Sequence, residues 1–205
     1  MSNIGGLSSL RNRYCALRHG HSKANEKGII LSSPKDGVKE EYSLTTLGEQ
    51  QVRASVMKAQ QEKLLSADTV IISSPFSRAR RSAEIAREIL GAKEAILIDA
   101  RLRERWFGTW EGTSNVHYEK VWVADKKNPY HTECMIEAAA SVQHRVTELI
   151  LTIECTCKGK TFLLVSHGDA LQILQTAFAR KSPAVHRSMK HLETAEVREL
   201  HLTKL

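Results

Sequence analysis

The sequence contains no long hydrophobic run and no cysteine pattern that suggests cross-linking. No apolar stretch among its 205 residues approaches the length of a membrane-spanning helix, so we do not expect an integral membrane protein. The N-terminus has no continuous hydrophobic segment, which argues against a secretory signal. The four cysteines have neither the spacing of a zinc site nor that of a redox site. We therefore expect small buried thiols in a reducing, cytoplasmic compartment. The cysteines are Cys15, Cys134, Cys155 and Cys157.

The chain also lacks internal repeats, low-complexity segments and linkers, so a single domain is expected over residues 14–205, preceded by a flexible arm over 1–13. Short apolar runs predict strands, and apolar residues repeating every three to four positions predict helices. Their alternation implies an α/β three-layer sandwich with a mostly parallel central sheet flanked by helices on both faces. Strands are predicted from residue 14, over 67–74, over 96–98, from residue 161 and over 196–202. Helices are predicted from residue 46 and over 77–90, 136–154 and 170–179. Residues 102–135 are expected to be irregular with short helices.

The charge is unbalanced toward the basic side, with a formal net charge of +7. Such an excess suits nucleic acid, an anionic membrane or small phosphorylated molecules. Nucleic-acid binding needs an extended basic face with exposed aromatic residues between the charges. Many basic residues instead lie near the predicted site, so we expect a small phosphorylated substrate and neither a nucleic-acid nor a membrane partner. These residues are Arg18, Lys23, Lys27, Arg78, Arg80, Arg81, Arg101, Arg103 and Arg105.

Two predicted strands, from 14 and from 161, end in the same His-Gly pair. His19 follows Arg18 after the first strand, and His167 comes before Gly168 after the later one. Ligands of open α/β sheets bind beyond the carboxyl ends of the strands. An arginine beside a histidine, with a glycine that lets the backbone come close, suits a phosphate. One such histidine is more often structural, but the two together predict a common phosphate site.

Two further segments supply the other groups that phosphoryl transfer needs, which are cations around the oxygens and an acid for the leaving group. Arg78 directly follows a predicted strand and a proline, which favours it over the neighbouring helix arginines. Glu104 lies between two arginines and is one candidate for the acid. Glu111 is its rival, although it can instead cap a turn.

Five motifs occur in an order that resembles the histidine phosphatase superfamily, also called phosphoglycerate mutase-like. The resemblance covers nearly the whole chain from Tyr14 to the last predicted strand. Arg-His-Gly alone arises often by chance, whereas five motifs in order are specific. The motifs are Arg-His-Gly-His-Ser at 18–22 with Asn25, Leu-Thr at 44–45 through Gly48 and Gln51, Ser-Pro-Phe-Ser-Arg-Ala at 74–79, Leu-Arg-Glu at 102–104 with Phe-Gly-Thr-Trp-Glu-Gly at 107–112, and Ser-His-Gly at 166–168.

The resemblance implies a reaction through phosphohistidine, with no metal and no cofactor. His19 would be the nucleophile, and its attacking nitrogen must be unprotonated, which nearby arginines favour by charge repulsion. Glu104 would protonate the leaving alkoxide and then help to activate water. Arg18, Arg78 and His167 would grip the phosphoryl oxygens, assisted by Ser22, Asn25 and the Gly168 amide.

We therefore predict a phosphatase for a small phosphomonoester, either a sugar phosphate or a phosphoglycerate-type acid, with Arg101, Arg103 and Arg105 available to hold a second anion. A phosphoglycerate mutase is the alternative. Mutases that depend on a cofactor carry a longer, arginine-rich insertion after the glutamate motif, and they must enclose a bisphosphate while it reorients. The short 105–166 segment fits hydrolysis better. A catalytically silent binding module is a further alternative, but every expected catalytic residue is present.

Other features receive simpler interpretations. Trp106, Phe107 and Trp110 are expected to pack in the interior, and His21 to be a variable loop residue. The C-terminal Thr203-Lys204-Leu205 differs by one residue from the peroxisomal Ser-Lys-Leu signal, a weak indication of a peroxisome-type organelle. The sequence does not distinguish a monomer from a homodimer. The remaining histidines are expected at the surface: His117, His131, His144, His186, His191 and His201.

Overall fold

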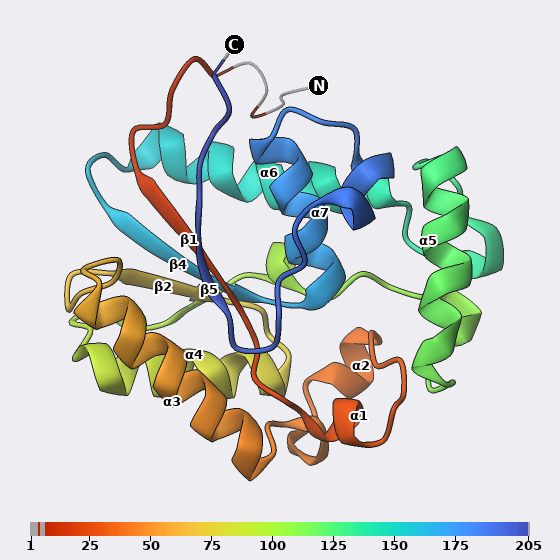
Figure 1. Cartoon of the computed structure of the whole chain (residues 1–205), viewed down its shortest axis with the longest axis horizontal. Coiled ribbons are helices and arrows are strands. Elements are labelled where there is room, and N and C mark those ends of the chain that lie inside the picture. The colour runs from red at the N-terminus through yellow and green to blue at the C-terminus, as the bar shows by residue number, and fades with distance from the viewer. Residues whose placement is uncertain (1–3, 5–6, 205) are drawn as a thin grey trace.

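The computed structural model describes residue 4 and residues 7–204, and its centre is one mixed sheet (Figure 1). The strand order is β3-β2-β4-β1-β5. Neighbours from β3 to β1 are parallel, whereas β5 runs antiparallel to β1. The predicted mostly parallel sheet is therefore confirmed. The strands are β1 (Arg13–Arg18), β2 (Val70–Ser73), β3 (Leu97–Ile98), β4 (Thr161–Ser166) and β5 (Val197–Leu200).

Helices cover both faces of the sheet, because alternate side chains of each buried strand enter different apolar clusters. In β1, Tyr14 and Ala16 face one cluster, and Cys15 and Leu17 face the other. The first cluster lies under α6 and α7, and the second under α3 and α4 (Figure 1). The three-layer arrangement is confirmed. The helices are α3 (Thr46–Gln61), α4 (Ser77–Leu90), α6 (Ala139–Thr156) and α7 (Gly168–Phe178).

A further part of the chain, outside these three layers, lies over the carboxyl ends of β1, β2 and β4 and covers them. It contains α1 (Lys23–Glu26), α2 (Pro34–Gly37) and α5 (Tyr118–Lys127), seen at the right of Figure 1. A small apolar cluster that includes Phe107 and Val121 anchors this cover. Short 3-10 helices complete the fold: Glu40–Tyr42, Ala100–Leu102, Gly108–Trp110, Asn115–His117, Glu133–Met135 and Pro183–Ser188, the last of which is η7.

Local details depart from the sequence predictions at three places. Residues 102–135 contain a ten-residue helix, α5, in addition to the expected short turns. The spacing of Thr46 and Glu49 is that of a capping box with Thr46 as the N-cap, but the N-cap of α3 is Thr45, whose side chain accepts a hydrogen bond from the backbone N–H of Gly48. Cys134 and Cys155 are exposed, whereas Cys15 is buried as expected. Helix α4 covers the predicted range 77–90, and Gly91 caps it in the left-handed conformation.

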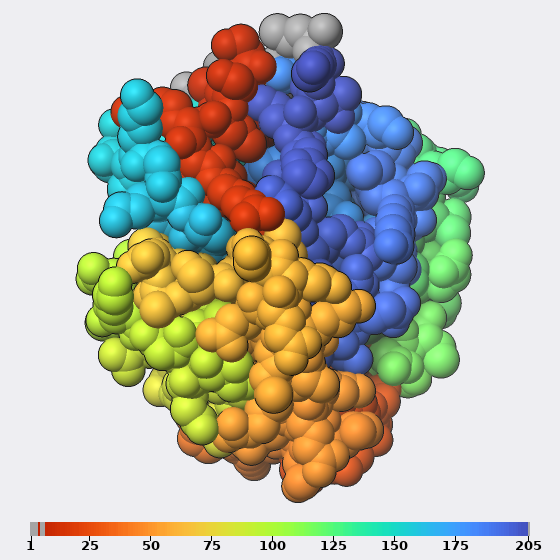
Figure 2. Space-filling view, turned by 60° about the vertical axis from the view of Figure 1, so that its left-hand side comes forward, coloured from red at the N-terminus to blue at the C-terminus, as the bar shows by residue number. Residues whose placement is uncertain are grey.

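The N-terminal segment was predicted to form a flexible arm. Its described residues pack against the rest of the domain. Ile4 is fully buried, and Leu7 and Leu10 pack against the main core. The side-chain amide of Asn12 donates to the Glu154 carboxylate at 2.9 Å. Figure 2 shows this segment in red beside the C-terminal segment in blue, as the pairing of β1 with β5 requires. The sequence did not predict that these residues pack against the core, because isolated apolar residues carry no periodic signal.

Residues 1–3 and 5–6 of the predicted arm lie outside the described residues, as does Leu205 of the C-terminal tripeptide. Within the described part of the chain, we find no helix with the length and apolar character needed to cross a membrane.

Candidate active site

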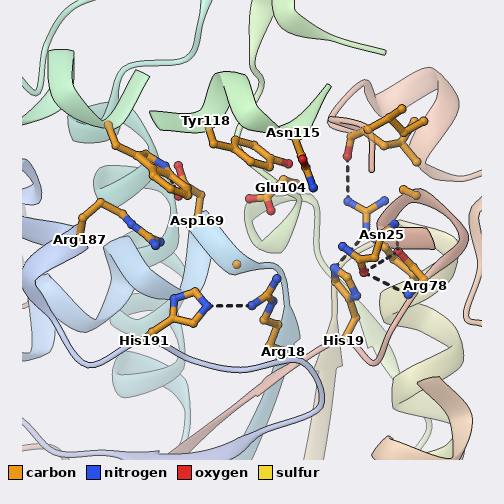
Figure 3. A pocket seen from close by; sticks show the side chains of 16 residues that line it. Arg18, His19, Asn25, Arg78, Glu104, Asn115, Tyr118, Asp169, Arg187 and His191 are labelled. Atoms are coloured by element: carbon orange, nitrogen blue, oxygen red, sulfur yellow. Dashed lines mark hydrogen bonds between the residues drawn. The ribbon is translucent and has the colours of Figure 1, made fainter. Parts of the chain in front are cut away.

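A cavity of about 280 Å³ opens at the carboxyl ends of the parallel strands (Figure 3). Its walls come from the loop after β1, from α4, from the loop around Glu104, from α5, from the start of α7 and from the chain that follows it. The predicted site residues that line the cavity are Arg18, His19, Ser22, Asn25, Arg78, Glu104 and Gly168. His167 is not in the cavity wall and lies immediately behind His19, with ring centroids 5.1 Å apart.

Two neighbours fix the tautomer of His19. Its Nδ1 lies 2.8 Å from the carbonyl oxygen of Gly20, and its Nε2 lies 3.1 Å from Nε of Arg78. A carbonyl can only accept and a guanidinium can only donate, so Nδ1 carries the proton and Nε2 holds a lone pair. Burial, with the charges of Arg78 and Arg18, keeps the pKa of His19 well below its usual range. The ring is therefore neutral at neutral pH.

His167 is fully buried at the end of β4, and Ser74 contacts it from the end of β2. The Ser74 Oγ lies 2.8 Å from Nε2 of His167 and accepts a hydrogen bond from the backbone N–H of Phe76. The hydroxyl hydrogen of Ser74 is thus free to donate to Nε2, which would leave the proton of His167 on Nδ1. Burial and the Arg78 charge lower the pKa of His167 strongly.

The two arginines of the site present unsatisfied donors. Arg78 donates through Nη2 to the Leu31 carbonyl oxygen at 2.9 Å, and Arg18 donates through Nη1 to the Leu192 carbonyl oxygen at 2.9 Å. Within the part of the chain that the structure describes, Nη1 of Arg78, Nε of Arg18 and Nδ1 of His167 are buried and have no hydrogen-bond partner. Buried polar groups are rarely left unpaired. Three of them around His19 form a site suited to an anion.

Glu104 faces this group of cations across the cavity (Figure 3). One carboxylate oxygen, Oε1, accepts hydrogen bonds from the backbone N–H groups of Arg105 at 2.8 Å and Ala170 at 3.2 Å. Burial and the nearby charge of Asp169 raise the pKa of Glu104. A proton on its other oxygen, Oε2, can be given to a group in the cavity. By contrast, the rival Glu111 binds the backbone N–H groups of Ser32 and Ser33 and holds that loop.

Small residues and helix starts bring backbone close to the cavity. Ser22 caps α1, accepting from the Asn25 N–H and donating to the Asn25 side chain, which fixes both polar groups at the wall. Gly168 begins α7, and a Cβ there would lie 3.4 Å from the guanidinium carbon of Arg18. The eleven-residue α7 thus directs its N-terminus at the same place, which adds to the attraction for an anion.

The arginines predicted to hold a second anion are engaged elsewhere, so that prediction is wrong in its residues. Arg101 pairs with Asp99 at 2.7 Å, and Arg103 pairs with Glu137 at 2.8 Å. Arg105 is fully buried behind the site. These arginines occupy every second position, but in an irregular segment that spacing does not tell where their side chains point. The acidic residues with which they pair are not apparent from the sequence either. The cavity wall instead contains residues that the sequence did not single out: Asn115, Tyr118, Trp122, Asp169, Arg187 and His191.

Several histidines expected at the surface lie elsewhere. His131 and His186 are buried beside Asp125, and His131 contacts its carboxylate at 2.9 Å. His191 lines the cavity and accepts from Arg18 through Nε2 at 3.2 Å. His144 and His201 are exposed as expected. Among the described residues, no group of three or more His, Cys, Asp or Glu side chains is arranged to hold a metal ion.

Comparisons of the sequence point to one family with more than one activity. A putative phosphoserine phosphatase 2 of Hydrogenobacter thermophilus is 28% identical over 173 residues, covering 79% of this chain and 76% of the relative. A probable phosphoglycerate mutase, GpmB of Escherichia coli, is 32% identical over 165 residues, covering 77% of this chain and 70% of the relative.

Solved structures share the fold. Bacillus stearothermophilus YhfR aligns with a TM-score of 0.72 and 26% identity, covering 92% of this chain and 90% of the other. A mycobacterial glucosyl-3-phosphoglycerate phosphatase in complex with VO3 aligns with a TM-score of 0.75 and 20% identity, covering 91% and 90%. The sequence pattern of the histidine phosphatase superfamily, branch 1, matches residues 14–204. The chain therefore belongs to the histidine phosphatase superfamily.

Proposed function

We propose that this member of the family is a phosphatase that hydrolyses a small phosphomonoester through a phosphohistidine intermediate. The observation that carries the proposal is the set of buried, unpaired donors on Arg18, Arg78 and His167 around the lone pair of His19. A phosphoryl group has three oxygens over which its charge is spread, and cationic donors around them stabilise the transition state.

In the first step, Nε2 of His19 attacks phosphorus and the bond from phosphorus to the leaving oxygen breaks. Arg78 now donates to that lone pair, so its Nε must turn from His19 to a phosphoryl oxygen before attack. Glu104 gives its proton to the leaving alkoxide, which departs as an alcohol. The raised pKa of Glu104 supports this role, because a carboxyl group must be protonated to act as the acid.

In the second step, the Glu104 carboxylate takes a proton from water, and the water oxygen attacks the phosphohistidine. The bond from Nε2 to phosphorus breaks, inorganic phosphate is released, and His19 and Glu104 return to their starting states. The Nδ1 proton stays on His19 throughout, held by the Gly20 carbonyl oxygen. The cavity volume of about 280 Å³ suits a small substrate, such as a sugar phosphate or a phosphoglycerate-type acid.

A phosphoglycerate mutase is the second candidate, supported by the 32% identity to probable phosphoglycerate mutase GpmB. Both activities share the phosphohistidine and differ in what receives the phosphoryl group. Product analysis with 3-phosphoglycerate separates them, since a phosphatase releases inorganic phosphate and a mutase forms the 2-phospho isomer. Isomer formation without phosphate release contradicts the hydrolase proposal.

The central test compares the wild type with His19→Ala on a panel of phosphomonoesters, scored by phosphate release. We expect loss of at least about a thousandfold in kcat, because the substitution removes the nitrogen that attacks phosphorus in the proposed reaction. A quenched reaction with labelled substrate is expected to trap acid-labile label on the wild type and none on the variant. The exposed His144→Ala is the matched control and is expected to retain both activity and label. Full activity in His19→Ala contradicts the proposed nucleophile.

A further inference from the structure

We infer that Arg187 forms a second anion subsite, which binds a negatively charged group carried by the leaving part of the substrate. The inference rests on the proposed function, because it concerns the part of the cavity beyond the phosphoryl group. Arg187 belongs to η7 (Pro183–Ser188), which follows α7, and none of the sequence motifs includes it.

The first support is the position of Arg187 in the cavity. Arg18 and Arg78 lie around His19, and Arg187 lies farther along the wall, beyond His191 (Figure 3). Its charge contributes to lowering the pKa values of both Arg18 and His191, which places it within electrostatic reach of both. The cavity thus has cations at two separate places, only one of which is needed for a phosphoryl group.

The second support is the way Arg187 is held. Its guanidinium carbon lies 3.7 Å from the ring centroid of Trp122, and Trp122 stacks on Tyr118 with centroids 5.4 Å apart. The Trp122 indole N–H donates to the carboxylate of Asp169 at 2.9 Å. The stack therefore fixes the plane of the guanidinium against the wall, so that little side-chain freedom remains to be lost on binding.

The third support is that Arg187 has no ion pair with an acidic side chain in the described part of the chain. By contrast, Arg101 and Arg103 each pair with one carboxylate and Arg105 pairs with two. Arg187 also lines an adjacent surface hollow of about 420 Å³, which it shares with Trp122. A cation that is held in place, unpaired and in the cavity wall is suited to bind a ligand anion.

The ligand class follows from this chemistry. A planar guanidinium binds a carboxylate or a phosphate through two parallel hydrogen bonds. We therefore assign as substrates phosphomonoesters whose leaving group carries its own carboxylate or phosphate, in preference to esters with neutral leaving groups.

The test uses three esters with the same three-carbon skeleton, which bear a carboxylate, a hydroxymethyl group or a second phosphate. These are 3-phosphoglycerate, glycerol 3-phosphate and glycerol 1,3-bisphosphate. Phosphate release is measured for the wild type, Arg187→Gln and Arg187→Lys. The Gln variant removes the charge and keeps a planar polar end over Trp122, and the Lys variant keeps the charge.

The wild type is expected to prefer at least one charged ester over glycerol 3-phosphate, and the preferred ester tells carboxylate from phosphate recognition. For that ester, Arg187→Gln is expected to lower kcat/KM by about 10- to 100-fold, mainly through KM, as the loss of a charge-assisted hydrogen bond predicts. For glycerol 3-phosphate the loss is expected to stay below about threefold, and Arg187→Lys restores part of the preference.

Arg101→Ala is the matched control, since it removes an arginine that the sequence favoured and that pairs with Asp99 outside the cavity. It is expected to leave the ratio between esters unchanged. Equal losses on all three esters in Arg187→Gln, an unchanged ratio, or a wild type without a charge preference overturns the inference.

Binding to the His19→Ala variant, which is not expected to turn over, keeps this test separate from the proposed function. If the wild type releases no phosphate from any ester but charged esters bind more tightly in an Arg187-dependent way, the proposed function fails and the subsite stands. If phosphate is released but neither rate nor binding depends on Arg187, the subsite alone fails.

Discussion

His19 is held by partners that differ in chemistry, and this determines the proton transfers that the site can support. The Gly20 carbonyl oxygen accepts a hydrogen bond from the Nδ1–H of His19, and Arg78 donates to Nε2, so the ring presents a lone pair without needing a base. In the proposed reaction, Glu104 is then the group whose protonation must change. The pH dependence of the first step therefore reports mainly on Glu104.

Glu104→Gln is expected to affect substrates according to their leaving group. The first step needs protonated Glu104, so kcat/KM for an alkyl phosphate is expected to fall as pH rises through the raised pKa of this residue. In Glu104→Gln that basic limb disappears, and kcat/KM for alkyl phosphates falls by about 100- to 10,000-fold. For 4-nitrophenyl phosphate, whose leaving group needs little protonation, the loss is expected to be much smaller. Initial rates across pH, corrected for substrate ionisation, measure this.

Glu111→Gln is the matched control, because Glu111 was the rival acid and contacts Ser32 and Ser33 instead. It is expected to lower stability without changing the ratio of alkyl to aryl activity. A leaving-group effect in Glu111→Gln, or its absence in Glu104→Gln, shows that the acid has been misassigned.

The sequence predicted which residues lie near the cavity best for those that follow a strand end, and less well for residues on other elements. His19, Arg78 and His167 follow buried strands, whose parallel arrangement brings their carboxyl ends together. Arg187 and Trp122 enter the same cavity from η7 and α5, and their positions depend on packing between distant segments. No local pattern carries that information.

At the scale of elements, the N-terminal part of α3 and its cap hold the loop that carries His19. The carboxamide of Gln51 accepts from the His21 N–H at 3.0 Å, and the Thr45 N–H donates to the His21 carbonyl oxygen at 2.9 Å. A Cβ at Gly48 would lie 2.0 Å from that same carbonyl oxygen. This contact explains why the motif around 44–51 accompanies the histidine motif, a link that the sequence resemblance supplied without its physical cause.

Gly48→Ala is therefore expected to displace the loop after β1. The added methyl group has no room, so either the helix or the loop must move, with a loss of about 1–3 kcal/mol in the free energy of unfolding. Because the loop carries His19, kcat/KM is expected to fall by at least about tenfold. Urea unfolding and phosphate release measure the two effects.

Gly91→Ala provides the comparison. Gly91 has a φ of 60°, and a Cβ there meets no atom within 4 Å, so only backbone strain of about 1–2 kcal/mol is expected. It ends α4 away from the cavity, and kcat/KM should stay near the wild-type value. Equal effects of the two substitutions on kcat/KM contradict the role assigned to the α3 contact.

At the scale of the whole molecule, the layers of the sandwich were predictable and the cover over the cavity was not. Alternating apolar side chains in β1 and β4 divide the core between two faces, which the alternation of strands and helices predicts. The cover depends instead on α5, whose ten residues lie in a segment expected to be irregular. The sequence did not predict this helix, because its buried face contacts polar as well as apolar groups. Its mixed polar and aromatic composition therefore shows no clear apolar repeat.

A buried ionic group joins this cover to the domain. Arg105 donates to both carboxylate oxygens of Asp125 on α5, at 2.6 and 2.8 Å, and to Asp169 on α7 at 3.2 Å. Arg105 and Asp125 are fully buried, and His131 also contacts Asp125. Since Arg105 directly follows Glu104, the same group fixes the proposed general acid and the wall that carries Trp122.

Asp125→Asn is expected to weaken the support of both Glu104 and the wall that carries Trp122. It leaves the buried Arg105 charge paired with Asp169 alone, and breaking a buried pair costs about 3–5 kcal/mol, so we expect a loss near 3 kcal/mol in the free energy of unfolding. Asp68→Asn is the matched control, because it makes the same chemical change at the exposed pair with Lys93 and is expected to have a much smaller effect. Urea unfolding of both variants compares their free energies of unfolding.

If the cover depends on this group, Asp125→Asn also lowers kcat/KM under conditions where the protein is fully folded, while Asp68→Asn does not. Comparable small losses in the two variants would mean that apolar packing around Phe107 and Val121 holds the cover without the ionic group.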